Sequence, residues 1–227
     1  MIDRWLEWGP PLLRGTALTI FLTVTSFAFA LVLGLVLALA RLDRRRWYLY
    51  TPAQAFVELV RGTPLLVQLF YLFFVLPFVG ITMNPIVTGI LGLGINYGAY
   101  MSEVYRAGIE AIDRSQWEAA HALAMPTPLI LRLVVLPQAF RIVIPPMGNY
   151  LVSLFKDTAI VATISIQELL FSARLLASQT FQYLAIFTAV LVIYFAISSV
   201  GVGYAWTEIL APCLFRSFSQ SIQTVPS

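Results

Sequence analysis

The sequence contains three long stretches without a charged side chain, at residues 15–40, 62–102 and 175–207. A helix needs about 20 apolar residues to cross the hydrocarbon core of a bilayer, so each stretch is long enough for at least one crossing. Only 11% of the residues are charged and 59% are hydrophobic, whereas soluble domains carry about 25% charged residues. A chain with so few charged groups cannot cover a surface that faces water. We therefore predict an all-α integral membrane protein.

Turn-forming residues divide the uncharged stretches into individual helices. The middle stretch has room for two crossings, and it is interrupted by Pro77, Gly80, Asn84 and Pro85. We expect residues 1–227 to form a single transmembrane domain with about five spans, near 15–40, 57–77, 86–108, 129–155 and 183–206. The segment 207–227 is rich in Ser and Gln and is expected to be a loosely ordered tail.

The positions of the arginines predict the orientation of the chain. Cytoplasmic loops of membrane proteins carry an excess of Lys and Arg. The loop after the first span has four arginines between residues 41 and 46, and the segment 106–132 has three more. The loop between the second and third spans has no charge. We therefore expect the N-terminus outside, the C-terminus in the cytoplasm, and the segment 106–132 on the cytoplasmic face.

The segment 115–126 is predicted to be a short, capped helix between two apolar segments. Ser115 and Glu118 have the spacing of a capping box in which Ser115 is the N-cap, and alanine, the strongest helix former, fills four of the next six positions. Met125-Pro126 ends the helix. Packing within a membrane domain does not require such a polar helix. We expect a rigid knob of about two turns that fits a groove on a partner protein.

Four motifs, in this order along the chain, resemble a known family. The stretches 56–68, 99–109 and 155–158 are similar to the polar amino-acid subfamily of ABC importer permeases, which includes histidine-, glutamine-, arginine- and glutamate-type permeases. Between them, Glu118-Ala119-Ala120 with Leu136-Pro137-Gln138-Ala139 resembles the EAA loop of these membrane subunits. The sequence departs from that pattern at Ala124 and Ser115, where the family usually has glycine. The resemblance covers roughly residues 14–206.

The resemblance implies a fold and a set of partners. It implies a type I ABC importer permease of the bacterial inner membrane, in which the segment 115–126 is the cytoplasmic coupling helix. The implied partners are two copies of an ATP-binding subunit, which bind ATP and Mg²⁺, a second permease subunit, identical or homologous, and an external or periplasmic substrate-binding protein. The residues implied to couple the chain to the ATPase are Trp117, Glu118, Ala119, Ala120, His121 and Leu123.

The chain itself is not expected to be an enzyme or to hold a cofactor. It has no Gly-x-x-x-x-Gly-Lys-Ser/Thr loop, so ATP hydrolysis is expected in a separate chain. It has one histidine and one cysteine, and no cluster typical of a metal site. The implied function is to move a polar amino acid through the membrane by alternating access.

Polar side chains within apolar segments are costly and mark candidate transport sites. Glu103 follows the long uncharged stretch, and Lys156-Asp157-Thr158 ends the fourth predicted span. Asn149 lies seven residues before Lys156 and shares its helix face. A zwitterionic amino acid needs donors for its carboxylate and acceptors for its ammonium group. The expected substrate-binding residues are Thr63, Gln68, Glu103, Asn149, Lys156, Asp157 and Thr158.

These candidates also have structural interpretations. Glu103 has the i, i+3 spacing of an ion pair with Arg106, and Lys156 and Asp157 are compatible with a pair at the membrane interface. The sequence Arg61-Gly62-Thr63-Pro64 predicts either a bend that turns backbone groups toward a cavity or an ordinary helix start with Arg61 reaching the headgroups. Gly94 and Gly98 have the spacing of closely packed helices and of a dimer seam.

A second function class is open at this stage. An autonomous ion-coupled secondary transporter or channel would use Glu103, Asp157 or Glu168 as proton or ion sites. Such carriers are often built from inverted repeats, which we do not find in five spans. That alternative also leaves the polar knob at 115–126 without a role.

Overall fold

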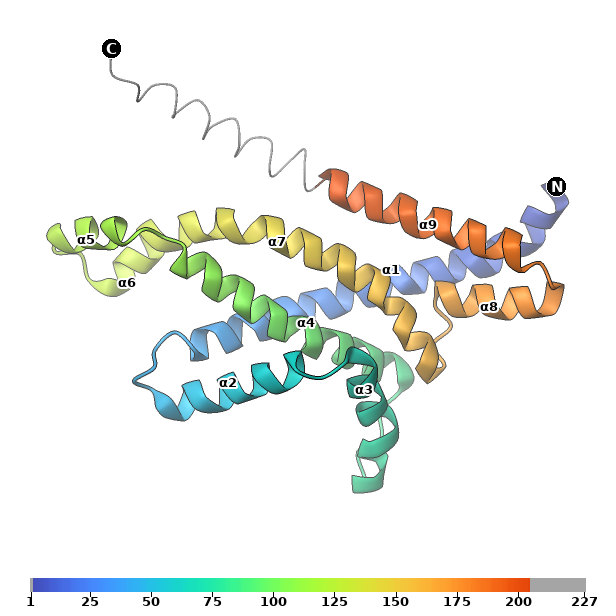
Figure 1. Ribbon diagram of the computed structural model, residues 1–227, viewed down its shortest axis with the longest axis horizontal. Helices are drawn as coiled ribbons and strands as arrows, with labels where there is room; N and C mark the ends of the chain where they lie inside the picture. The colour runs from blue at the N-terminus through green and yellow to red at the C-terminus, as the bar shows by residue number, and fades with distance from the viewer. Residues whose placement is uncertain (1, 205–227) are drawn as a thin grey trace, which may run out of the picture.

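The computed structural model describes residues 2–204, and all regular structure in that range is helical. The N-terminus and α5 lie at opposite ends of an elongated molecule (Figure 1). Two short helices continue into other helical forms. Helix α3 is followed by a π-helical turn, Tyr71–Val75, and a 3-10 turn, Leu76–Val79. Helix α6 continues through a π-helical turn, Leu131–Val135, into α7. The helices are α1 (Ile2–Ala40), α2 (Trp47–Arg61), α3 (Leu65–Phe70), α4 (Pro85–Glu110), α5 (Arg114–Ala122), α6 (Thr127–Ile130), α7 (Leu136–Asp157), α8 (Leu169–Thr180) and α9 (Tyr183–Tyr204).

Helices lie at all the places where spans are expected, but their bounds differ. Within the described residues, the segments Trp8–Ala40 and Thr127–Ile164 are long and apolar enough to cross a membrane, and the bent pair of α2 and α3 makes a third if it is one span. The count of five spans stays a prediction. The end of the fifth span at 206 and the tail 207–227 lie outside the described residues.

The expected bend between residues 61 and 64 is present and turns the chain by 106°. Pro64 lacks a backbone N–H, so it cannot continue the hydrogen bonding of α2. The Gln68 amide nitrogen replaces the missing donor: it lies 2.6 Å from the carbonyl oxygen of Val60 and 3.1 Å from that of Thr63. It also donates to the Thr63 hydroxyl at 2.9 Å. Gln68 therefore satisfies backbone groups that the break leaves open, as an apolar environment requires.

Glycines allow α1 and α4 to approach each other closely. A Cβ added at Gly34 of α1 would lie 2.6 Å from Met101 Cβ and 2.9 Å from the Gly98 carbonyl oxygen of α4. On α4, a Cβ at Gly94 would meet Phe29 and one at Gly98 would meet Leu33, both on α1. The prediction of close packing is confirmed for Gly94 and Gly98. Because they pack against the chain's own α1, they are not available as a dimer seam.

Helix α8 was not expected from the sequence, and a buried carboxylate begins it. Both Glu168 carboxylate oxygens accept backbone hydrogen bonds, one from Leu170 at 2.9 Å and the other from Phe171 at 2.7 Å. The Tyr194 hydroxyl of α9 donates to the same side chain at 3.1 Å. Glu168 is fully buried and acts as an N-cap, which stabilises the first turn of a helix. It thereby joins α8 to α9.

The close contact of α1 and α4 makes Gly34 sensitive to substitution. We expect Gly34→Ala to reduce the stability of the protein by about 1–3 kcal/mol, because the added methyl overlaps Met101 and the α4 backbone. Thermal unfolding in detergent measures this change.

The matched control is Gly9→Ala, since an added Cβ at Gly9 meets no atom within 4 Å beyond its chain neighbours and the backbone of its own helix. Alanine is also the better helix former. An equal loss of stability in both variants would contradict the close packing described here.

Candidate functional site

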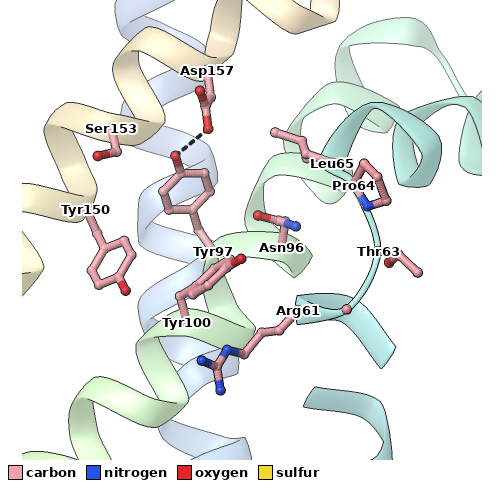
Figure 2. Close-up of a pocket in the computed structure, with 11 residues that line it drawn as sticks. Arg61, Thr63, Pro64, Leu65, Asn96, Tyr97, Tyr100, Tyr150, Ser153 and Asp157 are labelled. Carbon is pink, nitrogen blue, oxygen red and sulfur yellow. Dashed lines mark hydrogen bonds between the residues drawn. The ribbon is translucent and has the colours of Figure 1, made fainter. Parts of the chain in front are cut away.

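A polar cavity of about 450 Å³ lies where the α2–α3 break faces α4 and α7. Figure 2 shows side chains from all of these segments around it. The break contributes both backbone and side chains because the helix is interrupted there. The residues that line the cavity are Arg61, Gly62, Thr63, Pro64, Leu65, Asn96, Tyr97, Tyr100, Tyr150, Ser153 and Asp157.

Opposite charges stand at the two ends of a row of tyrosines in this cavity (Figure 2). At one end, Asp157 accepts a hydrogen bond of 2.7 Å from the Tyr97 hydroxyl. At the other end, the Arg61 guanidinium lies over the Tyr100 ring, 5.4 Å from its centroid. The Tyr150 ring stacks on Tyr100 with centroids 5.7 Å apart. The site thus offers an anion, a cation and an aromatic wall between them.

The structure brings together only some of the residues expected to bind substrate. Asp157 and Thr63 line the cavity. Gln68 lies one contact behind it, accepting a hydrogen bond of 3.2 Å from the lining residue Asn96. The remaining expected residues do not line it: Asn149 and Lys156 are exposed outside the cavity, Thr158 is buried, and Glu103 lies in a separate network.

Sequence reasoning missed the tyrosines, and the face of α7 that lines the cavity is not the one that carries Asn149 and Lys156. Tyr150, Ser153 and Asp157 are spaced at three, four and seven residues, so they share one face. The expected pair of Asn149 and Lys156 lies one residue away from that face, a rotation of about 100° around the helix. The same spacing argument, applied to Asp157 instead of Lys156, finds the lining residues.

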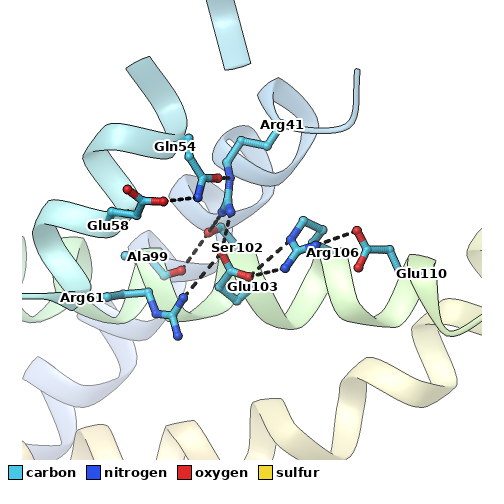
Figure 3. Close-up of polar contacts among 9 residues, drawn as sticks. All are labelled: Arg41, Gln54, Glu58, Arg61, Ala99, Ser102, Glu103, Arg106 and Glu110. Carbon is cyan, nitrogen blue, oxygen red and sulfur yellow. Dashed lines mark hydrogen bonds and ion pairs between the residues drawn. The ribbon is translucent and has the colours of Figure 1, made fainter. Parts of the chain in front are cut away.

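Glu103 occupies the centre of an ion-pair network that joins three helices (Figure 3). Its carboxylate lies 2.5 Å from Arg41 at the end of α1, 3.6 Å from Arg61 of α2 and 2.8 Å from Arg106 of α4. The Arg41 side chain is only 3% exposed, and it also donates to Gln54 and Ser102. The expected pair with Arg106 is therefore present but forms only one part of this network.

The network touches the cavity through Arg61. Arg61 both lines the cavity and lies within 3.6 Å of Glu103. Glu103 therefore affects the site indirectly, by helping to orient Arg61, rather than by lining it.

Within residues 2–204, the three carboxylates that an ion-coupled carrier would use all have partners. Glu103 pairs with arginines, Asp157 accepts a hydrogen bond from Tyr97, and Glu168 accepts hydrogen bonds from backbone N–H groups.

The helix expected at 115–126 is α5, and its start was predicted wrongly. The N-cap is Asp113, whose carboxylate accepts a hydrogen bond of 2.8 Å from the backbone N–H of Ser115. This bond to the ionised form lowers the pKa of Asp113. The capping box fails because Ser115 already lies inside the helix. α5 ends at Ala122, and Ala124 has a left-handed φ of 56°, which explains why glycine suits that position.

Two of the expected coupling residues point inward. Ala120 is buried, and Trp117 packs against the same cluster, which includes Ile112 and Ile130. This packing fixes α5 to the end of α4 and to the end of α6. The expected coupling residues that remain exposed are Glu118, Ala119, His121 and Leu123.

The network around Glu103 generates a stability prediction. We expect Glu103→Gln to cost about 3–5 kcal/mol, because it leaves the buried Arg41 guanidinium without its anion. Thermal unfolding in detergent, with the yield of folded protein, is the measurement.

Glu110→Gln provides the matched control on the same helix. Glu110 pairs with Arg106 at 2.6 Å but its side chain is 61% exposed, so its loss should cost less than about 1 kcal/mol. Similar losses from the two substitutions would show that Glu103 is not the centre of the network.

Known proteins resemble this chain over most of its length. The family model of the binding-protein-dependent transport system inner membrane component matches residues 30–215. The probable amino-acid ABC transporter permease protein y4tG of Sinorhizobium fredii is 44% identical over 207 residues, covering 91% of this chain and 85% of the relative. The L-cystine transport system permease protein TcyB of Bacillus subtilis is 38% identical over 195 residues, covering 84% and 82%.

Solved structures agree in fold. A crystal structure of an amino acid ABC transporter with histidines superimposes with a TM-score of 0.86 at 30% identity, covering 90% of this chain and 95% of the other. An inward-facing MetNI methionine ABC transporter matches at 22% identity with a TM-score of 0.71, covering 88% and 95%. The chain therefore belongs to the family of binding-protein-dependent transport system inner membrane components, as the multi-pass permease subunit of an ABC importer.

Proposed function

We propose that this permease subunit carries a polar amino acid across the inner membrane, and that the cavity between Arg61 and Asp157 holds it during passage. The observation that carries the proposal is the pair of opposite charges on either side of the tyrosine wall. An α-carboxylate pairs with a guanidinium, and an α-ammonium group pairs with a carboxylate. A volume of about 450 Å³ falls within the usual range for small-molecule sites, about 300–1,000 Å³.

The tyrosines suit the rest of such a substrate. Tyr97, Tyr100 and Tyr150 combine apolar ring faces with hydroxyl groups, so they accept both the aliphatic and the polar parts of an amino-acid side chain. The rings also attract an ammonium group through their π faces. The named relatives, a probable amino-acid permease and an L-cystine permease, support the same substrate class.

Asp157 provides the sharpest test of the cavity. We expect Asp157→Asn to reduce uptake of the transported amino acid by at least about tenfold, because an uncharged amide replaces the anion that binds the ammonium group. The measurement is uptake into vesicles containing the complete transporter, with its ATPase and binding protein, across the 20 standard amino acids.

Lys156→Gln is the control, since Lys156 is the next residue but lies exposed outside the cavity. It should change uptake by less than about twofold. If Lys156→Gln impairs uptake as much as Asp157→Asn does, the cavity is not the substrate site.

The exposed face of α5 is proposed to dock on the ATPase. Glu118 and His121 supply polar contacts there and Leu123, with 76% of its surface exposed, supplies an apolar one. Two ATPase subunits, each binding ATP and Mg²⁺, would close on ATP binding and bring this helix toward its counterpart on a second permease subunit, identical or homologous. The helices joined to α5 would then turn the cavity from one side of the membrane to the other.

The proposed orientation of the chain in the membrane rests on the end of the molecule that carries α5. The arginine-rich loop between α1 and α2 lies at the end of the molecule that carries α5 (Figure 1). By the positive-inside rule we propose that this end is cytoplasmic, which leaves the N-terminus outside. With the expected five spans, the C-terminus is then inside. A substrate-binding protein would then deliver the amino acid at the opposite, external end.

The docking face is tested by reversing its charge. We expect Glu118→Lys to abolish recovery of the ATPase with the permease from gentle detergent, at unchanged expression, since a reversed charge within an interface costs several kcal/mol. Glu58→Lys makes the same change at an exposed site on α2, where the carboxylate accepts a hydrogen bond of 2.6 Å from Gln54, and should leave recovery intact at unchanged expression. Ala120 is unsuitable because it is buried. Full recovery with Glu118→Lys would exclude this face as the docking site.

A further inference from the structure

A second polar cavity lies at the cytoplasmic end, apart from the substrate site. It has a volume of about 190 Å³ and sits between the end of α1, the start of α2 and the end of α4. Three arginines line it, Arg41 and Arg44 from the loop between α1 and α2 and Arg106 from α4. The lining residues that matter here are Arg41, Arg44, Tyr50, Gln54, Arg106 and Glu110.

We propose that this cavity binds the phosphate group of an anionic phospholipid from the cytoplasmic leaflet. Basic pockets between membrane helices on that side are suited to anionic headgroups. With Arg41, Arg44 and Arg106 against the single carboxylate of Glu110, the lining carries a net charge of +2. Even with Glu103 behind it, which neutralises one more charge, the site retains an excess positive charge.

The charge that a ligand would meet first belongs to Arg44. Arg41 and Arg106 already hold carboxylates, at Glu103 and Glu110. The Arg44 guanidinium has a different partner, the ring of Tyr50, with its centre 5.7 Å from the ring centroid. No carboxylate lies within ion-pair distance of Arg44 in the described part of the chain, so its full charge is available to a phosphate oxygen.

The position of the cavity favours a lipid over a soluble phosphate. The uncharged stretch of α1 ends at Ala40, directly before the cavity residue Arg41. Large aromatic side chains next to it are exposed, Trp47 by 72% and Tyr48 by 59%. Trp and Tyr gather at the headgroup level of membranes. The cavity therefore opens where phospholipid phosphates lie.

The size of the cavity separates it from the substrate site. At about 190 Å³, against about 450 Å³ for the substrate cavity, it is smaller than the usual range for drug-sized ligands. It suits one compact group, such as the phosphate of a phospholipid, while the attached diacylglycerol remains in the bilayer. The two cavities are connected through Glu103, which contacts Arg41 and Arg106 on one side and Arg61 on the other.

The test measures lipid binding to the purified, assembled transporter by native mass spectrometry. Phosphatidylglycerol and phosphatidylcholine are titrated separately. We expect the unmodified protein to prefer phosphatidylglycerol, and Arg44→Gln to weaken phosphatidylglycerol binding on the order of tenfold. Arg44 is exposed and contacts only a ring, so the variant should fold normally.

Two further variants separate a built site from general surface charge. Arg45→Gln removes the same charge from the next exposed position, which does not line the cavity, and should change binding by less than about twofold. Glu110→Gln removes the carboxylate that competes for Arg106 and should strengthen phosphatidylglycerol binding, which a merely structural role would not predict.

The outcomes are distinct. Equal losses in Arg44→Gln and Arg45→Gln, or no preference for phosphatidylglycerol, overturn the proposal. Binding of millimolar inorganic phosphate that depends on Arg44, without any preference among lipids, would assign the cavity to a soluble anion and also overturn the lipid source. Selective loss in Arg44→Gln with a gain in Glu110→Gln establishes the site.

Discussion

The ion pair of Arg41 and Glu103 supports both polar cavities of this permease. It joins the end of α1 to α4, and the same carboxylate reaches Arg61 of α2. Taking charges out of water is costly, so such a pair persists only with further hydrogen bonds. Arg41 obtains them from Gln54 and Ser102. The end of α1, the second half of α2 and the last third of α4 are thereby held together at the point where the apolar part of α1 stops.

The break between α2 and α3 exposes polar backbone groups within an apolar segment. A substrate site inside the membrane needs polar atoms that are free to meet the substrate, and an interrupted helix provides them. The interruption also leaves carbonyl groups without donors. Gln68 donates to those of Val60 and Thr63, and its own side-chain oxygen accepts a hydrogen bond from Asn96, which lines the cavity. The bend is consequently a specific structure with its own donor.

The two polar sites give α4 a central role in the proposed mechanism. Its glycines allow α1 to approach, its residues Asn96, Tyr97 and Tyr100 form one side of the proposed substrate cavity, and its end leads into α5. A movement of α5, driven by the ATPase, would therefore act directly on a helix that lines the cavity. Arg106, near the end of α4 that leads into α5, pairs with Glu103 and also lines the basic cavity.

The sequence by itself determined the membrane class, the helical fold and the presence of a short polar helix near residues 115–126, because hydrophobicity and helix propensity are local properties. It left the bend at Pro64 open beside an ordinary helix start. It also placed Asp157 and Thr63 among the site residues. Only the tertiary structure decided which face of α7 meets α4, that Gly94 and Gly98 pack on α1, and that Trp117 points inward. Those outcomes depend on contacts between distant segments, and a rotation of one residue along a helix changes the neighbour a side chain meets.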